Sequence, residues 1–488
     1  MKSVHTHRGL RLLLGVLVAL LCFSQHVLAG SKGDKEDVKA VPVSIPQHLV
    51  NSNLHRFIDL SSPIVRERTT IIIQNKGESP ASEYWLSVPA ALADASLSLL
   101  TAKTAPKKEA PQDLLVEKSQ FDAANDVQYF KVKLASPLAK DEKLTLQINV
   151  AYTHVLKPYP KAIAQSDVQF VEFSDSVYFH TPYFTEKQRI TVHLPTSNVK
   201  NYTNANLPVV KKGTDIVYGP YTAVDAFERS PLYVHFEFPR IVAVARNYEK
   251  EIELSHWGNN MFVKEHYELH NEGAKLKGHY ARVDLYFKAI PNALRALDIT
   301  LPPNIKNVFY RDAIGNVSTS NFHQNSQRSL LQIKPRYPVF GGWKYTWHHT
   351  FDVPLDQFVK KDAHRDRYIL QVPILGSIPN VTVDHGHFKI ILPEGASFVE
   401  ILSPYTFDKQ TFVKHYTVFD STGRQAVVLE KRNMVDEFGA PIQIVYDFPA
   451  WRIFQKPLVV SAAFGAIFLI GIIAARLDLS ISKASTTR

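Results

Sequence analysis

The sequence predicts a mainly β protein with two tandem antiparallel, sandwich-like domains and one transmembrane helix near its C-terminus. Three observations support this fold class. Strand-like runs fill most of the chain, short motifs recur at a nearly constant spacing, and one long uncharged run lies close to the end. Regular helical segments do not alternate with the strand runs, which favours antiparallel sheets packed face to face.

The strand-like runs begin after a polar, charged start at residues 30–39 that we expect to be flexible. They are rich in β-branched and aromatic residues, or they alternate apolar with polar residues, and turn residues bound most of them. The Pro- and Lys-rich segment 103–124 is predicted to be a loop, with a loop that contains a short helix as the alternative. The clearest strand runs are residues 69–73, 128–134, 144–152, 190–194 and 232–238.

Three short matches recur in the same order in the two halves of the chain. They are residues 75–77 with 271–273 (196 residues apart), residues 144–150 with 345–351 (about 201 apart), and residues 190–195 with 389–393 (198 between their prolines). Such self-similarity indicates an internal duplication. We therefore predict two β-domains, residues 30–240 and residues 241–450.

The membrane helix is predicted over residues 457–475, which contain no charged residue. The apolar stretch 458–475 would span ~27 Å as a helix, close to the thickness of an endoplasmic reticulum bilayer core. The pairs Ser461/Gly465 and Gly471/Ala475 have a small-x-x-x-small spacing, which permits close packing of a partner helix. Residues 476–488 are then a short cytosolic tail.

The N-terminus resembles a secretory signal peptide over residues 1–29. A basic start is followed by the apolar run 12–23 and by small residues at the −3 and −1 positions of a cleavage site at Ala29. An uncleaved anchor is the alternative. With cleavage, the protein is a single-pass type I membrane protein whose folded body lies in the lumen.

The only cysteine, Cys22, lies within this signal, so the predicted mature chain has none. This excludes disulfides, cysteine nucleophiles and thiolate metal sites, and the domains must be held by core burial. The net charge is +10 for the full chain and +7 after removal of the signal. The charges are scattered, which indicates a solvated surface and no nucleic-acid partner. Three N-glycosylation sequons begin at Asn201, Asn316 and Asn380.

Sequence motifs of catalysis and cofactor binding are absent from the chain. No phosphate-binding glycine loop, His-Glu-x-x-His motif or nucleophile elbow occurs, so we predict no catalytic, cofactor or metal residues. His385 and His387 have a ligand-like spacing, but a turn with surface histidines explains them better. Trp343, Tyr345 and Trp347 alternate on one strand face, which is typical of packing and is also compatible with a sugar- or peptide-binding platform.

Five segments resemble the ribophorin I family, whose members are subunits of the oligosaccharyltransferase of the endoplasmic reticulum. In order they are residues 252–258 (IELSHWG), 310–320 (YRDAIGNVSTS), 336–344 (RYPVFGGWK), 389–395 (KIILPEG) and 476–483 (RLDLSISK). This resemblance implies a non-catalytic role in transferring a preassembled glycan from dolichyl diphosphate to asparagine. It also implies partners: a multi-span catalytic subunit, small hydrophobic subunits and the nascent polypeptide.

A candidate interface follows from this resemblance. It combines Tyr310, Arg311 and Asp312 of the loop at residues 310–316 with Arg336, Tyr337, Gly341, Gly342 and Trp343 of the following motif. Gly341 and Gly342 allow a tight turn or a close backbone approach. The alternative is that these residues only fix the fold, with Arg311 and Asp312 in surface ion pairs.

Two other functions remain open from the sequence alone. A type I cell-surface adhesion or receptor module with two β-sandwich domains would have the same topology. A luminal hydrolase or metalloenzyme built around His385 and His387 is the third hypothesis.

Overall fold

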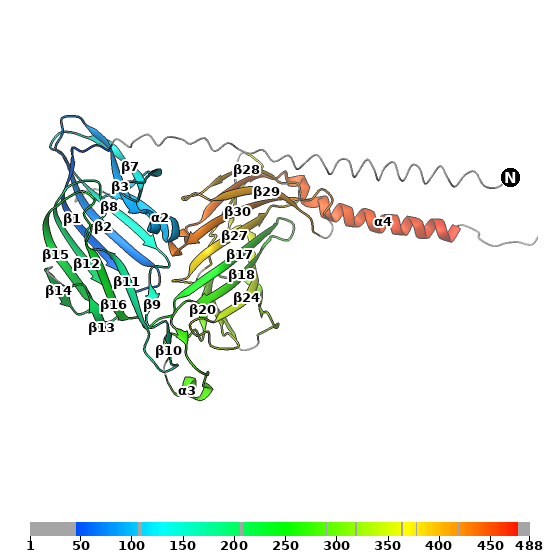
Figure 1. Cartoon of the computed structure of the whole chain (residues 1–488). Coiled ribbons are helices and arrows are strands. Elements are labelled where there is room, and N and C mark those ends of the chain that lie inside the picture. Colours follow the sequence, from blue (N-terminus) through cyan, green and yellow to red (C-terminus); the bar gives the residue numbers. More distant parts are fainter. Residues whose placement is uncertain are drawn as a thin grey trace, which may run out of the picture. The chain divides into compact units, whose positions relative to one another are not determined.

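The computed structural model describes residues 45–105, 110–204, 208–288, 290–317, 320–362, 365–376, 378–417 and 420–476. These residues are mostly β-strands, followed by one long helix, α4 (Gln455–Arg476), and this confirms the predicted fold class (Figure 1). The predicted signal peptide and most of the predicted tail lie outside the described residues.

The described residues of the N-terminal half form one large sheet and two smaller ones. The large sheet has the order β14 (Val209–Lys212), β15 (Asp215–Val224), β12 (Thr185–His193), β1 (Leu49–Asp59), β2 (Val65–Asn75), β8 (Lys143–Tyr152), β4 (Leu97–Thr104) and β5 (Asp113–Leu114). The smaller sheets are β13 (Val199–Tyr202), β16 (Pro231–Glu237), β11 (Phe170–Ser176) and β9 (Lys157–Pro158), and β3 (Ala81–Pro89), β7 (Val127–Leu138) and β6 (Val116–Asp122).

In the C-terminal half, the part that the structure describes also has one large sheet and two smaller ones. The large sheet has the order β21 (Lys306–Asp312), β24 (Lys344–Pro354), β18 (Asn260–Asn271), β17 (Ala243–Ser255), β27 (Thr382–Ile391), β30 (Arg424–Met434) and β29 (Lys409–His415). The smaller sheets are β25 (Val359–Lys361), β26 (Arg367–Val372), β31 (Ile442–Asp447) and β28 (Ser397–Leu402), and β20 (Leu297–Leu301), β23 (Ser329–Ile333) and β22 (Asn321–Gln324).

Short elements complete the chain. β10 (Ala162–Ile163) pairs with β19 (Lys275–Leu276) across the two halves. The short helices are α2 (Ala90–Ala95), α3 (Arg282–Phe287), η1 (Leu355–Gln357), η2 (Asp436–Gly439) and η3 (Ala450–Phe454). The prediction of a loop over residues 103–124 was wrong, because β5 and β6 lie there and add edge strands to two sheets.

The two large sheets share one order of strands. In the first, β12-β1-β2-β8 are neighbours, and in the second, β27-β17-β18-β24 are neighbours. In both, the first pair is parallel and the other pairs are antiparallel. The sheets are therefore not purely antiparallel. The shared order agrees with an internal duplication, but the duplication and the domain limits stay predictions.

The recurring Asn-x-Gly motif has one structural role in both sheets. Asn75 ends β2 and Asn271 ends β18, and each side-chain oxygen accepts a hydrogen bond from the backbone N–H of the glycine two residues later. The side-chain amide of Asn75 donates to two backbone carbonyls, as does that of Asn271. Each buried asparagine thus satisfies backbone groups where its strand ends.

Each large sheet also buries a cation on the strand that comes first in the sequence. Arg56 of β1 lies 2.6 Å from Glu67 of β2 and 2.6 Å from Asp175 of β11. Lys250 of β17 lies 3.0 Å from Glu265 of β18. The expectation that the charges are all solvated was wrong for these residues, which are buried. Burial is tolerated because each charge has an opposite partner.

The two halves contact each other through a polar cluster around His154. Its Nε2 atom lies 2.8 Å from Asp384 and its Nδ1 atom 3.2 Å from Glu272. Arg246 also pairs with both carboxylates. Hydrogen bonds to Asp384 and then to Glu272 raise the pKa of His154 to about 9. The imidazolium form is therefore favoured in the folded protein.

This cluster predicts a pH-dependent stability. The raised pKa means that the His154 contribution is fully present below pH 6.5, the pKa of a free histidine, and is lost as the pH rises towards about 9. We expect His154→Gln to lower the free energy of unfolding most at pH 6 and least at pH 9 or above. Denaturant unfolding of the detergent-solubilised chain would measure this. His323→Gln, at an exposed position in β22, is the control; a loss for His154→Gln that does not change with pH would contradict the prediction.

Candidate functional site

Strand pairing brings the two predicted interface segments together. β21 pairs with β24 in antiparallel register, with Tyr310 opposite His349 and Asp312 opposite Trp347. Residues 336–343 lead directly into β24, so they lie beside the loop that follows β21. The predicted proximity of the two segments is therefore found in the structure.

Arg336 fixes the loop after β21. It forms an ion pair with Asp312 and donates hydrogen bonds to the backbone carbonyls of Gly315 (3.3 Å) and Asn316 (2.9 Å). Asp312 in turn accepts hydrogen bonds from the backbone N–H groups of Ile314 (3.0 Å) and Gly315 (2.9 Å). The loop is thus held by one buried carboxylate and one guanidinium, and its conformation is set before any partner binds.

Of the two residues expected in surface ion pairs, Asp312 forms one with Arg336, whereas no ion pair of Arg311 is found among the described residues. Arg311 donates instead to the side-chain oxygen of Asn316 at 2.7 Å, and the carboxylate of Asp312 is almost fully buried. The neighbours Arg311 and Asp312 point to opposite faces of β21, because successive side chains in a strand alternate. Burial raises the pKa of Asp312, but the hydrogen bond from Arg336 and those from the loop backbone outweigh it and lower the pKa below its ordinary value.

Two tyrosine hydroxyl groups are linked to the carboxylate of Asp312 by hydrogen bonds. The hydroxyl groups of Tyr310 and Tyr345 lie 2.6 Å apart, and Tyr345 donates to Asp312 at 3.2 Å. Burial raises the pKa of Tyr345 to about 12 and also raises that of Tyr310. Both phenols therefore stay protonated and serve as hydrogen-bond donors. Such a network positions the loop and contains no activated nucleophile.

The top of the loop presents an apolar side chain to solvent. Ile314 is 79% exposed although the backbone on both sides of it is fixed. Phe309 of β21 and Tyr337 of the segment that precedes β24 are also exposed. Sequence reasoning named Tyr337 but did not single out Phe309 or Ile314. The signal for Ile314 was available: a large apolar residue between turn residues is an unusual choice for a solvated loop.

Gly341, Gly342 and Trp343 have packing roles in the structure. A Cβ atom at Gly341 would overlap the backbone carbonyl of Ala274, and Gly342 adopts a φ of +81° that favours glycine. Trp343 packs edge-on against Phe340, with 5.5 Å between ring centroids. These residues therefore allow residues 341–343 to pack closely against the segment that follows β18. Their part in an interface stays a prediction.

The alternating aromatic residues of β24 also prove to be packing residues. Tyr345 and Trp347 are buried, and Trp347 stacks on Tyr267 with 4.8 Å between ring centroids. They cannot serve as an exposed sugar- or peptide-binding platform. The second of the two sequence interpretations is therefore wrong for these two side chains.

His385 and His387 lie exposed on one face of β27. They line an open groove of about 580 Å³ together with Glu249, Asp408 and Glu430, among others. In the part of the chain that the structure describes, no group of three histidine, cysteine, aspartate or glutamate residues is arranged to hold a metal ion. The groove is better described as a charged, solvated surface.

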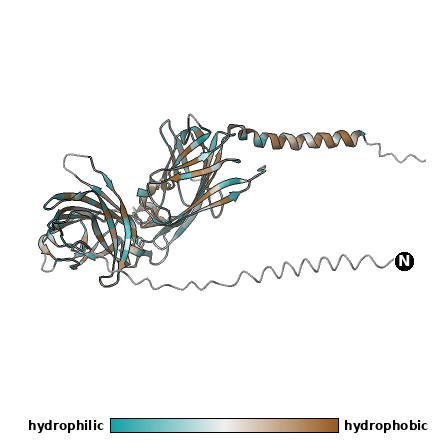
Figure 2. Ribbon diagram, turned by 90° about the horizontal axis from the view of Figure 1, so that it is seen from above, coloured by the Kyte–Doolittle hydropathy of each residue, from teal (hydrophilic) through white to brown (hydrophobic). Residues whose placement is uncertain are grey.

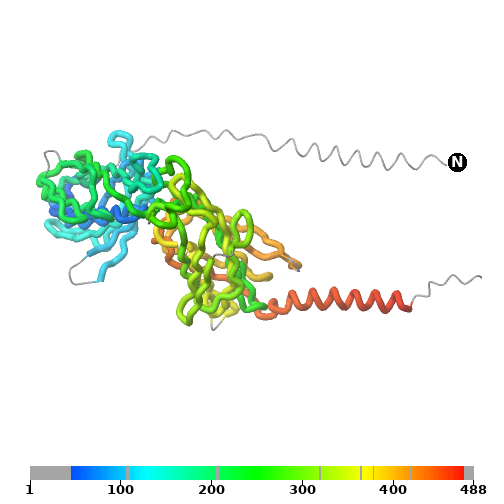
Figure 3. The backbone as a smooth tube through the Cα atoms, turned by 90° about the horizontal axis from the view of Figure 1, so that it is seen from below, coloured from blue at the N-terminus to red at the C-terminus, as the bar shows by residue number. Residues whose placement is uncertain are grey.

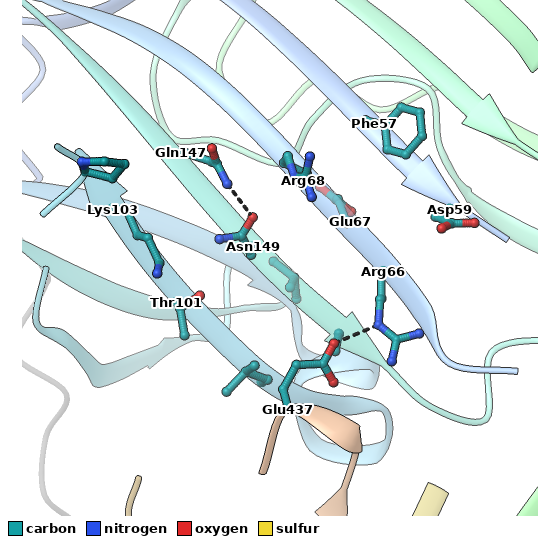
Figure 4. Close-up of a pocket in the computed structure, with 14 residues that line it drawn as sticks. Phe57, Asp59, Arg66, Glu67, Arg68, Thr101, Lys103, Gln147, Asn149 and Glu437 are labelled. Carbon is teal, nitrogen blue, oxygen red and sulfur yellow. Dashed lines mark hydrogen bonds and ion pairs between the residues drawn. The ribbon is translucent and has the colours of Figure 1, made fainter. Parts of the chain in front are cut away.

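A second groove, of about 500 Å³, lies on the large sheet of the N-terminal half. Figure 4 shows Arg66 of β2 reaching Glu437 of η2 at its edge, where the two side chains are 2.7 Å apart. Gln147 and Asn149 of β8 are hydrogen bonded to each other at its floor. Among the described residues that line it there is no serine, cysteine or histidine, and the hydroxyl group of the lining is that of Thr101.

The three sequons differ in accessibility. Asn201 lies exposed on the edge strand β13. Asn316 is exposed, but its side-chain oxygen accepts the hydrogen bond from Arg311. Asn380 is half-buried with a φ of +58°, and Thr382 of the same sequon is only 2% exposed within β27.

The helix α4 is long and apolar enough to cross a membrane, and none of it is buried against the rest of the chain. Figure 2 shows it as the most continuously hydrophobic element. Ser461, Gly465, Gly471 and Ala475 are all exposed on it. An added Cβ at either glycine would meet nothing, so both positions are free for a partner helix.

Comparisons with known proteins identify the chain's relatives. The family model described as Ribophorin I matches residues 49–475. Dolichyl-diphosphooligosaccharide–protein glycosyltransferase subunits 1A and 1B of Arabidopsis thaliana are each 34% identical, over 90% of this chain and over 72% and 95% of their own lengths. Subunit 1 of Caenorhabditis elegans is 32% identical, over 88% of this chain and 73% of its own. Among solved structures, yeast LTA4 hydrolase with bestatin matches at a TM-score of 0.27 and 10% identity, covering 42% of this chain and 31% of that one.

Sequon accessibility predicts which asparagines carry glycans. A glycan is bulky and must lie on the surface. We therefore expect Asn201 to be occupied and Asn380 to be empty when the protein is made in a secretory pathway. Asn201→Gln should raise the electrophoretic mobility of the protein by the shift that the loss of one glycan causes. The matched change Asn380→Gln should leave the mobility unchanged. The reverse pattern, or a glycan released from Asn380 by glycosidase and found by mass spectrometry, would contradict this.

Proposed function

Because the chain belongs to the ribophorin I family, we infer that it is a subunit of the oligosaccharyltransferase complex and acts in protein N-glycosylation. The observation that carries this conclusion is the match over residues 49–475, which includes both β halves and the apolar helix. The complex transfers a preassembled glycan from dolichyl diphosphate to the asparagine of Asn-x-Ser/Thr in nascent proteins. The alternative of a cell-surface adhesion or receptor module is not favoured, because the relatives are named as subunits of this transferase.

We propose that this subunit is not catalytic by itself and that its role is to stabilise the complex and to present the acceptor chain. The charged groups at the candidate site support this, because Asp312 and Arg336 are engaged with each other and with the loop backbone. Holding an acceptor close to the transferase lowers the entropic cost of their encounter. The active site then lies on a separate, multi-span subunit.

The loop fixed by Arg336 is the proposed contact with another subunit. An exposed, preorganised apolar residue loses little conformational entropy on binding, which favours Ile314 as an anchor. Helix α4 supplies a second contact through the two pairs of small residues, where partner helices such as those of small hydrophobic subunits can pack closely. The nascent polypeptide is a further proposed partner.

We place the protein in the membrane of the endoplasmic reticulum, with the β-rich body in the lumen and α4 as a single span in type I orientation. The sequon at the exposed Asn201 is consistent with a luminal body. The apolar N-terminus, with its cleavage-site pattern, supports the same orientation.

Purification of the tagged chain in mild detergent tests this function. We expect the multi-span transferase and its companion subunits to co-purify, and we expect glycan transfer to an acceptor peptide only in fractions that contain the transferase. The chain freed of its partners by harsher detergent should have no transfer activity. A monomer in mild detergent would overturn the assignment to the complex, and activity of the isolated chain would overturn the non-catalytic role.

The proposed anchor predicts the effect of a single substitution. Ile314→Asp places a charge at the contact without touching the fold, and loss of one such anchor costs at least about 1.4 kcal/mol, or about 10-fold in affinity. We expect the amount of partner that co-purifies to fall by about 10-fold. Arg336→Ala should act in the same direction because it releases the loop.

The matched control is Val210→Asp, at another exposed apolar residue, in β14 of the N-terminal half. Equal recovery of partners by the Ile314→Asp variant and the unchanged protein would remove Ile314 from the interface.

A further inference from the structure

The first turn of α4 is fastened to the folded body rather than joined by a flexible linker. Lys456 lies 2.9 Å from Asp420, and Gln455 donates to the hydroxyl of Ser421 at 2.7 Å. Asp420 and Ser421 precede β30 in the hairpin formed by β29 and β30, which Figure 3 traces next to the start of the helix. Two neighbouring helix residues are thus held by one hairpin.

Asp420 is the centre of this attachment. Its side chain is fully buried, and besides Lys456 it contacts Arg424 at 3.2 Å and the backbone and hydroxyl of Thr417 at 2.7 Å. Burial raises the pKa of Asp420, but hydrogen bonds from Lys456 and Thr417 outweigh it and lower the pKa to about 2. The carboxylate is therefore ionised, and it holds Lys456 and Arg424 in fixed positions.

The attachment sets the depth of the hairpin relative to the membrane. The uncharged run begins at residue 457, so Lys456 lies at the boundary of the hydrocarbon core. Asp420 is in direct contact with its ammonium group. Residues around Asp420 must therefore lie at headgroup level, no farther from the hydrocarbon than the length of one lysine side chain.

Three aromatic side chains are exposed at this level. Tyr416 is 63% exposed, Trp451 is 61% exposed and Phe454 is 62% exposed. Tyr416 comes from the hairpin and packs over Gly423, whereas the other two come from η3. Arg452 lies over the ring of Trp451, with 4.3 Å from its guanidinium carbon to the ring centroid. Aromatic rings with basic neighbours are the side chains that bilayer interfaces favour.

We propose that Tyr416, Trp451 and Phe454 form a membrane-contact surface by which the β body rests on the headgroup region of the adjacent leaflet. This surface is a second attachment besides the span, and it depends on the Asp420–Lys456 ion pair. The bilayer is favoured as the occupant because the surface is continuous with the spanning helix: Trp451 and Phe454 lie in η3 directly before α4, and Tyr416 lies in the hairpin that pairs with Lys456. The proposal rests on α4 crossing the membrane, which belongs to the proposed function.

Site-directed spin labelling tests this surface, since the chain has a single cysteine, Cys22. In a Cys22→Ser background, single cysteines replace Tyr416, Val210 of β14 and Ile467 of α4, all of which are exposed. The labelled full chains are reconstituted into phosphatidylcholine vesicles. The collision rates of each label with two reagents are then measured. Oxygen concentrates in lipid and a nickel complex stays in water, so the ratio of the two rates shows whether the label lies in lipid or in water.

We expect the oxygen-to-nickel ratio at residue 416 to exceed that at residue 210 several-fold and to lie below that at residue 467. A ratio at residue 416 equal to that at residue 210 would overturn the membrane contact while leaving the span intact. Protection of residue 416 from both reagents would also overturn it, because it indicates a protein neighbour. A water-exposed label at residue 467 would instead overturn the span and, with it, the proposed anchoring.

The role of the ion pair has its own test. Asp420→Asn keeps the shape of the side chain and removes the charge that holds Lys456. With the label at residue 416, this change should lower the oxygen-to-nickel ratio towards the value at residue 210, while the label at residue 467 stays in lipid. An unchanged ratio at residue 416 would overturn the proposed dependence on this pair.

Discussion

A buried row of paired residues crosses the large C-terminal sheet, and the candidate site depends on it. Lys250 of β17 lies opposite Glu265 of β18, Glu265 lies opposite His349 of β24, and His349 lies opposite Tyr310 of β21. A slip of one residue in any of these pairings would turn the side chains of that strand to the other face. It would also separate Lys250 from Glu265, and breaking such a buried pair costs about 3–5 kcal/mol. The charge pair therefore adds to the register preference that the buried apolar residues of these strands already impose.

The register of this row reaches the interface loop through hydrogen bonds. Tyr310 ends the row, and its hydroxyl meets that of Tyr345, which donates to Asp312. Asp312 holds Arg336 and the loop backbone. A continuous chain of contacts thus leads from the centre of the sheet to the loop that exposes Ile314. The N-terminal sheet also buries a paired cation, Arg56 of β1. Arg56 lies opposite Thr69 in the strand register, however, and it pairs with Glu67 and with Asp175 of another sheet.

Local patterns in the sequence predicted the β class and the meeting of the two interface segments. They could not predict the parallel pairings of β1 with β12 and of β17 with β27, because each joins strands more than 120 residues apart. They also placed Arg56 and Lys250 on the surface. A charged residue within an alternating strand looks solvated unless the partner that neutralises it is known, and Asp175 is 119 residues away from Arg56. The resemblance to a family supplied the function, which neither composition nor spacing contains.

The topology of the C-terminal sheet places the two proposed contact surfaces far apart. β21 and β29 are its opposite edges, six strand spacings or about 29 Å apart. β29 runs parallel to β17 and β21 runs antiparallel to it, so residues 312–316 and residues 416–424 also lie at opposite ends of the sheet. The interface loop and the hairpin that holds Lys456 therefore occupy diagonally opposite corners of one sheet. A partner that contacts Ile314 and a bilayer that contacts Tyr416 would then meet the sheet at separate places, so neither proposed contact would exclude the other.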